Sequence, residues 1–295
     1  TISKIHKRKY GFPEQPIHNY SMDLNEINLV FDKIINTNSS ERKDIPGMSK
    51  DRADIIVGGI MPLKVLIKYA GASKLIISGN GIREGAFFKY YFYKYKINEK
   101  IVANVLQHNI DNILLRYDVD IQHSYLIRKL SIDLYDSLIS LHKLDDSYRK
   151  LLKVSALLHD IGLHVDYYNH HYHGFYLTLN SRINGLNFKE LVICAFVVGM
   201  HRNEDLKQEW TDYQPVINSD DYEAIQILSL FVRISEELCK TQNGNIKELK
   251  CIKTKNSVNI IIEGNSSNQY IPALLQCEKA FKKLFDKNLV LQQSN

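Results

Sequence analysis

Residues 41–91 read ERKDIPGMSKDRADIIVGGIMPLKVLIKYAGASKLIISGNGIREGAFFKYY, and they decide the fold of the N-terminal part. A Pro-Gly turn precedes a stretch in which Ile56, Ile60, Leu63 and Ile67 recur at helical spacing, with Ser49 as the expected cap. Residues 71–81 predict a short β-branched strand that ends in a Gly-Asn-Gly turn, and a second helix follows. This order of helix, strand and helix is typical of an α/β domain.

The first of these helices contains Gly58, Gly59 and Pro62. In a helix interior each glycine costs roughly 1 kcal/mol and a proline about 3 kcal/mol. We therefore expect another element to pack closely there. Upstream, Ser21 is the expected cap of a helix whose apolar face carries residues 24, 27, 31 and 35.

The pattern changes after residue 97, where helical periods replace the strand signal as far as about residue 241. Apolar stripes on these helices fit a bundle core and equally a dimer interface. Beyond them, two alternating segments, a helix and a final short strand predict a ββαβ module. The sequence thus predicts three domains, at residues 1–97, 98–243 and 244–295.

Composition is that of a globular protein, with 44% hydrophobic and 24% charged residues. The sequence shows no secretory signal and no apolar run long enough to span a bilayer, so we expect a cytoplasmic protein. The four cysteines lack metal-site spacing and are interpreted as reduced thiols. A net charge of +5 favours polyanionic partners, but no nucleic-acid motif accompanies it.

Six of the 11 histidines fall between residues 159 and 201. In the segment ALLHDIG, His159 and Asp160 come at the end of an apolar helix, where both side chains can face a cleft. With His123 from an earlier helix, they form a candidate site for a divalent cation. The alternative is that these are structural histidines held by hydrogen bonds.

The His123, His159 and Asp160 pattern resembles the signature of the HD phosphohydrolase superfamily. That pattern closes with an aspartate on a later helix, whereas this sequence has Glu236 and Glu237 there, and the resemblance implies Glu236 as the remaining metal ligand.

Two further segments resemble the exopolyphosphatase and guanosine pentaphosphate phosphohydrolase (Ppx/GppA) family. Its second actin-like domain is matched by an ordered set of residues: Arg42, Pro46, Gly47, Arg52, Ala53, Asp54, Gly59, Ser78, Gly81, Arg83, Glu84 and Gly85. Its helical domain is matched by the His-Asp doublet, by HHYHG at residues 170–174 and by His201 with Arg202. The resemblance implies part of an actin-like, ribonuclease H-like α/β lobe followed by an HD-type helical bundle.

Members of this family cleave phosphoanhydride bonds of inorganic polyphosphate or of guanosine pentaphosphate with Mg²⁺. The family's phosphate loops and catalytic glutamate have no match in this sequence, so the resemblance implies that they lie upstream in a longer parent. This chain would then supply substrate-holding and dimerisation domains and would be inactive as an exopolyphosphatase alone. Two alternatives stay open: a metal-dependent HD phosphohydrolase, and a noncatalytic module that senses polyphosphate or a nucleotide.

A basic track that holds an anionic phosphate chain by counterion release is the expected substrate site. Its candidates are Lys4, Lys7, Arg8, Lys9, Arg42, Arg83, His171, His173, His201 and Arg202.

Overall fold

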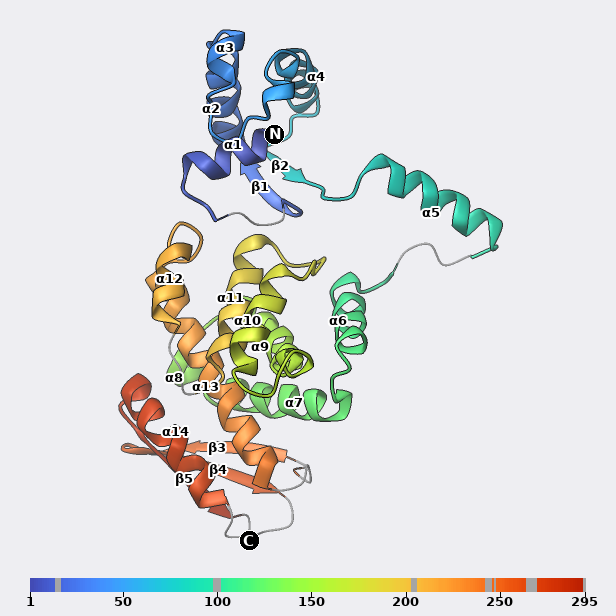
Figure 1. Ribbon diagram of the computed structural model, residues 1–295. Helices are drawn as coiled ribbons and strands as arrows, with labels where there is room; N and C mark the ends of the chain where they lie inside the picture. Colours follow the sequence, from blue (N-terminus) through green and yellow to red (C-terminus); the bar gives the residue numbers. More distant parts are fainter. Residues whose placement is uncertain are drawn as a thin grey trace. The chain divides into compact units, whose positions relative to one another are not determined.

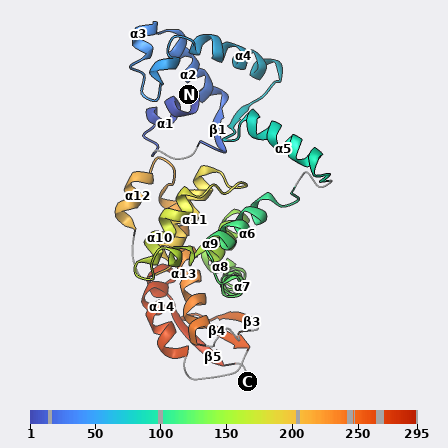
Figure 2. The same ribbon diagram turned by 45° about the vertical axis from the view of Figure 1, so that its right-hand side comes forward.

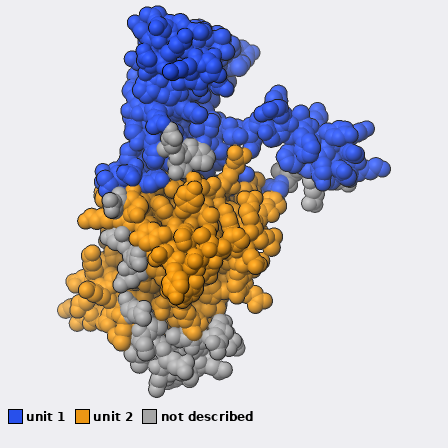
Figure 3. Space-filling view, in the orientation of Figure 1, with its two compact units in different colours: residues 1–103, 184–188, 211–216 blue, residues 104–183, 189–210, 217–295 orange. Residues whose placement is uncertain are grey.

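The computed structural model describes residues 1–13, 17–97, 102–202, 206–241, 246, 248–263 and 270–293. It divides into two compact units, which Figure 3 colours separately. Unit 1 comprises Thr1–Ala103 with Asn184–Phe188 and Thr211–Val216, and unit 2 comprises the remaining residues. The domain boundaries predicted after residues 97 and 243 fall at residues 98–101 and 242–245, which lie outside the described residues. The division into three domains therefore stays a prediction.

Unit 1 is built on helix α2, which packs on a two-stranded antiparallel sheet. In the sheet, Tyr20 pairs with Ile77 and Asp23 pairs with Lys74. The core of the unit is formed by large apolar side chains that are at most 2% exposed, namely Met22, Ile27, Val30, Phe31, Ile34 and Ile60. The elements of this unit are α1 (Ile2–Lys9), β1 (Tyr20–Asp23), α2 (Leu24–Ile35), α3 (Ser39–Arg42), η1 (Lys50–Arg52), α4 (Ile56–Tyr69), β2 (Lys74–Ile77) and α5 (Ile82–Lys94).

The caps predicted for the helices that correspond to α2 and α4 were wrong. Ser21 lies inside strand β1, and Asp23 caps α2 by accepting a hydrogen bond from the Glu26 amide. Ser49 precedes the short helix η1, and α4 begins only at Ile56. Three residues form one 3-10 turn here before the chain turns into α4, a break that apolar periodicity alone does not reveal.

The close packing expected at Gly58 and Gly59 is also not found. Within the described residues, a Cβ atom added at either glycine would meet nothing within 4 Å. Helix α5 also buries none of its residues, although it carries six aromatic side chains between Phe87 and Tyr93.

Unit 2 is mainly helical, as the sequence predicts for residues 98–241. The apolar stripe of helix α7 fills the core of the unit itself, since Ile127, Leu130, Leu134 and Leu138 are fully buried. These four side chains are therefore used in the core of the unit, and homodimerisation stays a prediction. The described helices between residues 105 and 241 are α6 (Val105–Arg116), α7 (Ile121–Ser137), α8 (Ile139–His142), α9 (Asp146–Leu158), η2 (Ile161–His164), α10 (His170–Asn180), α11 (Phe188–Met200), α12 (Lys207–Tyr213) and α13 (Ser219–Thr241). Phe188 of α11 and the last three residues of α12 belong to unit 1.

The C-terminal residues form the predicted ββαβ module, which lies against α13 in both ribbon views (Figures 1 and 2). Strands β3 (Glu248–Lys253) and β4 (Ser257–Glu263) are antiparallel, and β4 pairs in parallel with β5 (Asn288–Gln293). Helix α14 (Tyr270–Phe285) joins β4 to β5, and the ring of Phe285 stacks on Phe231 of α13 with centroids 6.3 Å apart. No described helix combines the length and the apolar character needed to cross a membrane.

Candidate metal centre

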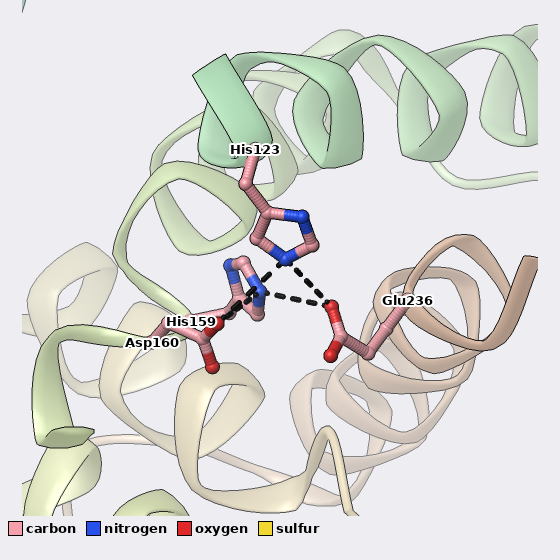
Figure 4. A group of neighbouring side chains, drawn as sticks. All are labelled: His123, His159, Asp160 and Glu236. Carbon is pink, nitrogen blue, oxygen red and sulfur yellow. Dashed lines mark hydrogen bonds and ion pairs between the residues drawn. The ribbon is translucent and has the colours of Figure 1, made fainter. Parts of the chain in front are cut away.

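Four side chains from three helices of unit 2 converge on one point (Figure 4). His123 comes from the first turn of α7, His159 and Asp160 follow the end of α9, and Glu236 comes from α13. Glu236 Oε2 lies 3.0 Å from His123 Nε2 and 3.2 Å from His159 Nε2. Asp160 Oδ2 lies 3.3 Å from His159 Nε2 and 3.7 Å from His123 Nε2. The structure thus brings together all four residues predicted as metal ligands.

The local sequence explains how α9 delivers two of them. Helix α9 ends at Leu158, and the chain turns through η2, where Gly162 touches the backbone of α10. A Cβ atom at Gly162 would lie 1.8 Å from the carbonyl oxygen of His170 and 2.5 Å from the amide nitrogen of Gly174. Only glycine permits this approach, which sets Asp160 beside α10.

The orientation of the His159 ring is fixed by a hydrogen bond to the backbone. Its Nδ1 lies 2.9 Å from the carbonyl oxygen of Ala156, to which it donates, and the side chain is completely buried. The donated proton is on Nδ1, so Nε2 is the ring atom that faces the two carboxylates. A hydrogen bond of this kind commonly orients histidines that bind metals.

His123 is the most accessible member, with 23% of its side chain exposed. Its Nδ1 lies 3.5 Å from Cys239 Sγ, one helical turn beyond Glu236 on α13. The contacts with Cys239 and Glu236 raise the pKa of His123 to about 10.

The remaining three groups show the expected charge coupling of a buried cluster. Burial lowers the pKa of His159, but the charge and hydrogen bonds of Asp160 and Glu236 outweigh it and raise the value to about 10. Burial opposes ionisation of Asp160 and Glu236, yet the neighbouring imidazoles hold the pKa of both carboxyl groups below the ordinary range. Without a metal, the two carboxylates therefore face two imidazolium groups and the ammonium group of Lys240, whose Nζ lies 3.2 Å from Glu236 Oε1. One divalent cation would balance the same two carboxylates with both imidazoles neutral.

A second group of ligand-type side chains adjoins the first. Asp160, His170 of α10 and His201 after α11 have ligand atoms within 4.8 Å of one another. His170 and His201 are 3% and 1% exposed. Arg233 of α13 fixes the turn that carries His201, since its guanidinium donates to the carbonyl oxygens of Met200, His201 and Arg202. Sequence reasoning missed His170 and Arg233 as site residues, although the clustering of histidines between residues 159 and 201 pointed to the first.

The donor set fits a divalent cation. Ligand atoms bound at roughly 2.0–2.2 Å around one ion lie about 3.0–3.6 Å apart, which is close to the spacing found here. Two imidazoles with two carboxylates suit Mn²⁺, Fe²⁺ or Zn²⁺ better than Mg²⁺, because Mg²⁺ prefers oxygen ligands and water. This centre does not bear on the Mg²⁺ ion that is expected to serve catalysis in the longer parent protein.

The basic residues predicted to hold substrate are divided between the units. Lys4, Lys7, Arg8, Lys9, Arg42 and Arg83 belong to unit 1, and His171, His173, His201 and Arg202 belong to unit 2. Lys7 and Arg42 are among those engaged inside their own unit. Lys7 is buried over the rings of Tyr20 and Phe188, and burial lowers the pKa of its ammonium group to about 8. The Arg42 Nε donates to the carbonyl oxygen of Ile34 at 2.9 Å. A continuous track stays a prediction, and Arg202 is the candidate that lies beside the histidine cluster, with Nε 3.3 Å from His170 Nε2.

Comparison with known proteins assigns both parts of the chain to one family. Residues 105–280 match the model of Ppx/GppA phosphatase domain III, and residues 1–93 match the model of the Ppx/GppA phosphatase family. The chain belongs to the Ppx/GppA phosphatase family. The resemblance inferred from the sequence motifs is confirmed.

Curated relatives in this family carry the name guanosine-5'-triphosphate,3'-diphosphate pyrophosphatase. The relative from Pseudoalteromonas translucida is 26% identical over 222 residues, which are 73% of this chain and 41% of that protein. Those from Aeromonas hydrophila and Aeromonas salmonicida are each 22% identical over 200 residues, which are 68% of this chain and 38% of those proteins. The chain thus spans about two fifths of the length of the relatives it matches.

Proposed function

We propose that unit 2 is a metal-dependent phosphohydrolase centre that cleaves a phosphate ester or anhydride bond of a guanosine polyphosphate. The observation that carries this proposal is the convergence of His123, His159, Asp160 and Glu236, whose Nε2 and carboxylate oxygen atoms face one point. Membership of a phosphatase family supports the reaction class. The printed name of the relatives supports guanosine pentaphosphate as the substrate to try first.

The chemistry of the site follows from its ligands. A divalent ion held by the four side chains would polarise a phosphoryl oxygen and lower the pKa of a bound water. The buried position of His159 and Glu236 keeps their donor atoms in a fixed arrangement and excludes bulk water from that side. The partial exposure of His123 leaves one side open to a substrate.

Arg202 is the residue that we propose to bind the phosphate. Its guanidinium lies at the edge of the histidine cluster, and the turn that carries it is held by Arg233. A guanidinium can donate two parallel hydrogen bonds to a phosphate, which would orient the substrate for attack. In this role Arg202 would exchange its contact with His170 for a contact with the phosphate.

Phosphate release tests the proposal. The chain would be freed of metal with a chelator, reloaded with Mn²⁺, and assayed with guanosine pentaphosphate and with long-chain polyphosphate. We expect release from guanosine pentaphosphate only after reloading, and a fall of about 100-fold or more in His159→Gln and Asp160→Asn, since metal catalysis supplies several kcal/mol. Polyphosphate should not be cleaved by this chain.

Arg149→Gln provides a matched control, because Arg149 forms an exposed ion pair with Asp136 away from the cluster. It should leave the rate unchanged. The proposal fails if the reloaded chain releases no phosphate from guanosine pentaphosphate, or if His159→Gln releases it at the same rate.

A further inference from the structure

Helices α6, α7 and α9 of unit 2 line an open pocket of about 420 Å³. Its floor is formed by apolar side chains, among them Ile110, Val154 and Leu157, which are at most 4% exposed. Four cationic side chains also line the pocket and are half-buried or exposed, namely Arg128, Lys129, Lys150 and Lys153. An apolar floor with a few polar groups, at this size, is typical of a small-molecule site.

The pocket lies on the side of α7 that faces away from the histidine cluster. Successive residues of an α-helix are rotated by about 100°, so Ile132 of the pocket lies on the face of α7 opposite His123. None of the residues that line the pocket belongs to the cluster of histidines and carboxylates. A molecule bound here would therefore touch no ligand of the proposed metal ion.

The cations of the pocket outnumber its carboxylates. Lys150 Nζ lies 2.7 Å from Glu190 Oε1 of α11, and Asp133 is the one carboxylate among the described residues that line the pocket. The guanidinium of Arg128 lies over the ring of Tyr125, 4.6 Å from its centroid, and this contact holds the charge in place. The excess of positive charge favours an anion that carries several charges.

Gln107 of α6 adds a hydrogen-bond acceptor to the same pocket. Its Nε2 lies 2.7 Å from Asp111 Oδ1 and 3.1 Å from the hydroxyl oxygen of Tyr125. Because an ionised carboxylate only accepts hydrogen bonds, the NH₂ group of Gln107 must face Asp111, and Oε1 is the remaining acceptor. Among the described residues no group donates to this oxygen. The exocyclic amine of a heterocyclic base is a matching donor.

We propose that this pocket binds a nucleoside polyphosphate as a ligand separate from the substrate of the metal centre. The base covers the apolar floor and donates to Gln107 Oε1, and the phosphates contact Arg128, Lys129 and Lys153. A bare phosphate chain would leave the floor uncovered, and an uncharged nucleoside would leave the cations unmatched. The site is independent of a bound metal and goes beyond the proposed function.

Isothermal titration of the chelated chain with adenosine triphosphate, adenosine and inorganic tripolyphosphate tests the proposal, with chelator present throughout. Under these conditions no metal ion can hold phosphates at the histidine cluster. We expect one adenosine triphosphate per chain with a Kd of about 100 μM or lower, and binding of tripolyphosphate and of adenosine that is at least about 10-fold weaker.

The paired substitution of Lys129→Gln and Lys153→Gln should weaken binding of adenosine triphosphate by about 10-fold or more, because charge-assisted hydrogen bonds to phosphate are lost. Both side chains are exposed, so the fold should be kept. Lys282→Gln with Lys283→Gln is the matched control, because it removes the same charge from exposed positions of α14 outside the pocket. This control should leave the affinity unchanged.

Gln107→Leu should weaken adenosine triphosphate by about 5-fold through the lost hydrogen bond and leave tripolyphosphate unchanged. Tripolyphosphate that binds as tightly as adenosine triphosphate would overturn a site for a nucleoside, and equal losses in the two lysine pairs would overturn its place in this pocket. No binding at about 1 mM overturns the proposal altogether. Phosphate release by the metal-loaded chain is measured separately, so failure of either proposal leaves the other standing.

Discussion

His123 and Glu236 are separated by 113 residues, yet His123 Nε2 lies 3.0 Å from Glu236 Oε2. The contact joins the first turn of α7 to the last turns of α13, across a core made by the same two helices. Helical domains of the superfamily that the sequence resembles carry aspartate at this point of the pattern. Glutamate is one methylene group longer than aspartate, and from α13 the Glu236 carboxylate still reaches both imidazoles.

Replacement of Glu236 by glutamine should weaken Mn²⁺ binding by about 10-fold to 100-fold or more. Losses of about 10-fold to 100-fold are common even for residues that only support metal ligands. Glutamine keeps the shape of the side chain but removes the charge that balances the cation. Isothermal titration of the chelated protein measures the effect. Asp136→Asn is the matched control, because Asp136 forms an ion pair with Arg149 away from the cluster and should not alter the affinity. Equal affinities for both variants would remove Glu236 from the site.

Cys239 should act as a positioning residue through His123. Its Sγ lies 3.5 Å from Nδ1, the ring nitrogen turned away from the other ligands. Cys239→Val would remove this partner, so we expect about 10-fold weaker metal binding and a lower pKa of His123 in the metal-free protein. Imidazole titration by nuclear magnetic resonance reports the pKa, which a purely structural defect elsewhere would not move. Cys251→Ser, at a half-buried cysteine of β3, serves as the comparison.

Gly162→Ala should destabilise unit 2 by about 3 kcal/mol or more, because overpacking against rigid backbone exceeds the usual range of 1–3 kcal/mol. The added methyl group would overlap the carbonyl oxygen of His170 and the amide nitrogen of Gly174. Gly85→Ala in α5 is the control, since nothing lies within 4 Å of its added Cβ and the helix should gain up to about 1 kcal/mol. Urea denaturation would compare the two. A Gly162→Ala protein as stable as the unmodified chain would contradict the close contact between η2 and α10.

The metal-free protein should lose stability as the pH rises from 6.5 towards 10. His123 and His159 have pKa values raised from 6.5 to about 10, so their contribution is complete below pH 6.5 and disappears as they lose protons. Asp160 and Glu236 have pKa values below 3.8 and 4.5, so their contribution is present above those values and is lost in acid. Thermal midpoints of the chelated protein at pH 6 and pH 9 test this.

Added Mn²⁺ should reverse the trend, because the metal needs neutral imidazoles and competes less with protons as the pH rises. The increase in midpoint on adding Mn²⁺ is therefore expected to be larger at pH 9 than at pH 6. An increase that shrinks with pH would argue for imidazolium groups that never give way to a metal.

The sequence was sufficient for the family, the helical character of residues 105–241 and the C-terminal ββαβ order. His123, His159, Asp160 and Glu236 were predicted as metal ligands from the clustered histidines and the superfamily pattern. The structure brings these four side chains together, and metal binding stays a prediction. The caps at Ser21 and Ser49 were wrong, since Asp23 and the short helix η1 depend on where the chain meets the sheet. The role of His170 could not be foreseen, because it depends on the backbone contact at Gly162 and on which ring nitrogen faces Asp160.

The most direct test of the central claim is anomalous scattering at the manganese edge from crystals of the chain grown with Mn²⁺. We predict a peak within bonding distance of His159 Nε2, Asp160 Oδ2 and Glu236 Oε2. If crystals grown with Mn²⁺ show no peak there, and Asp160 and Glu236 still contact the two imidazoles directly, the result would contradict a metal centre in this unit.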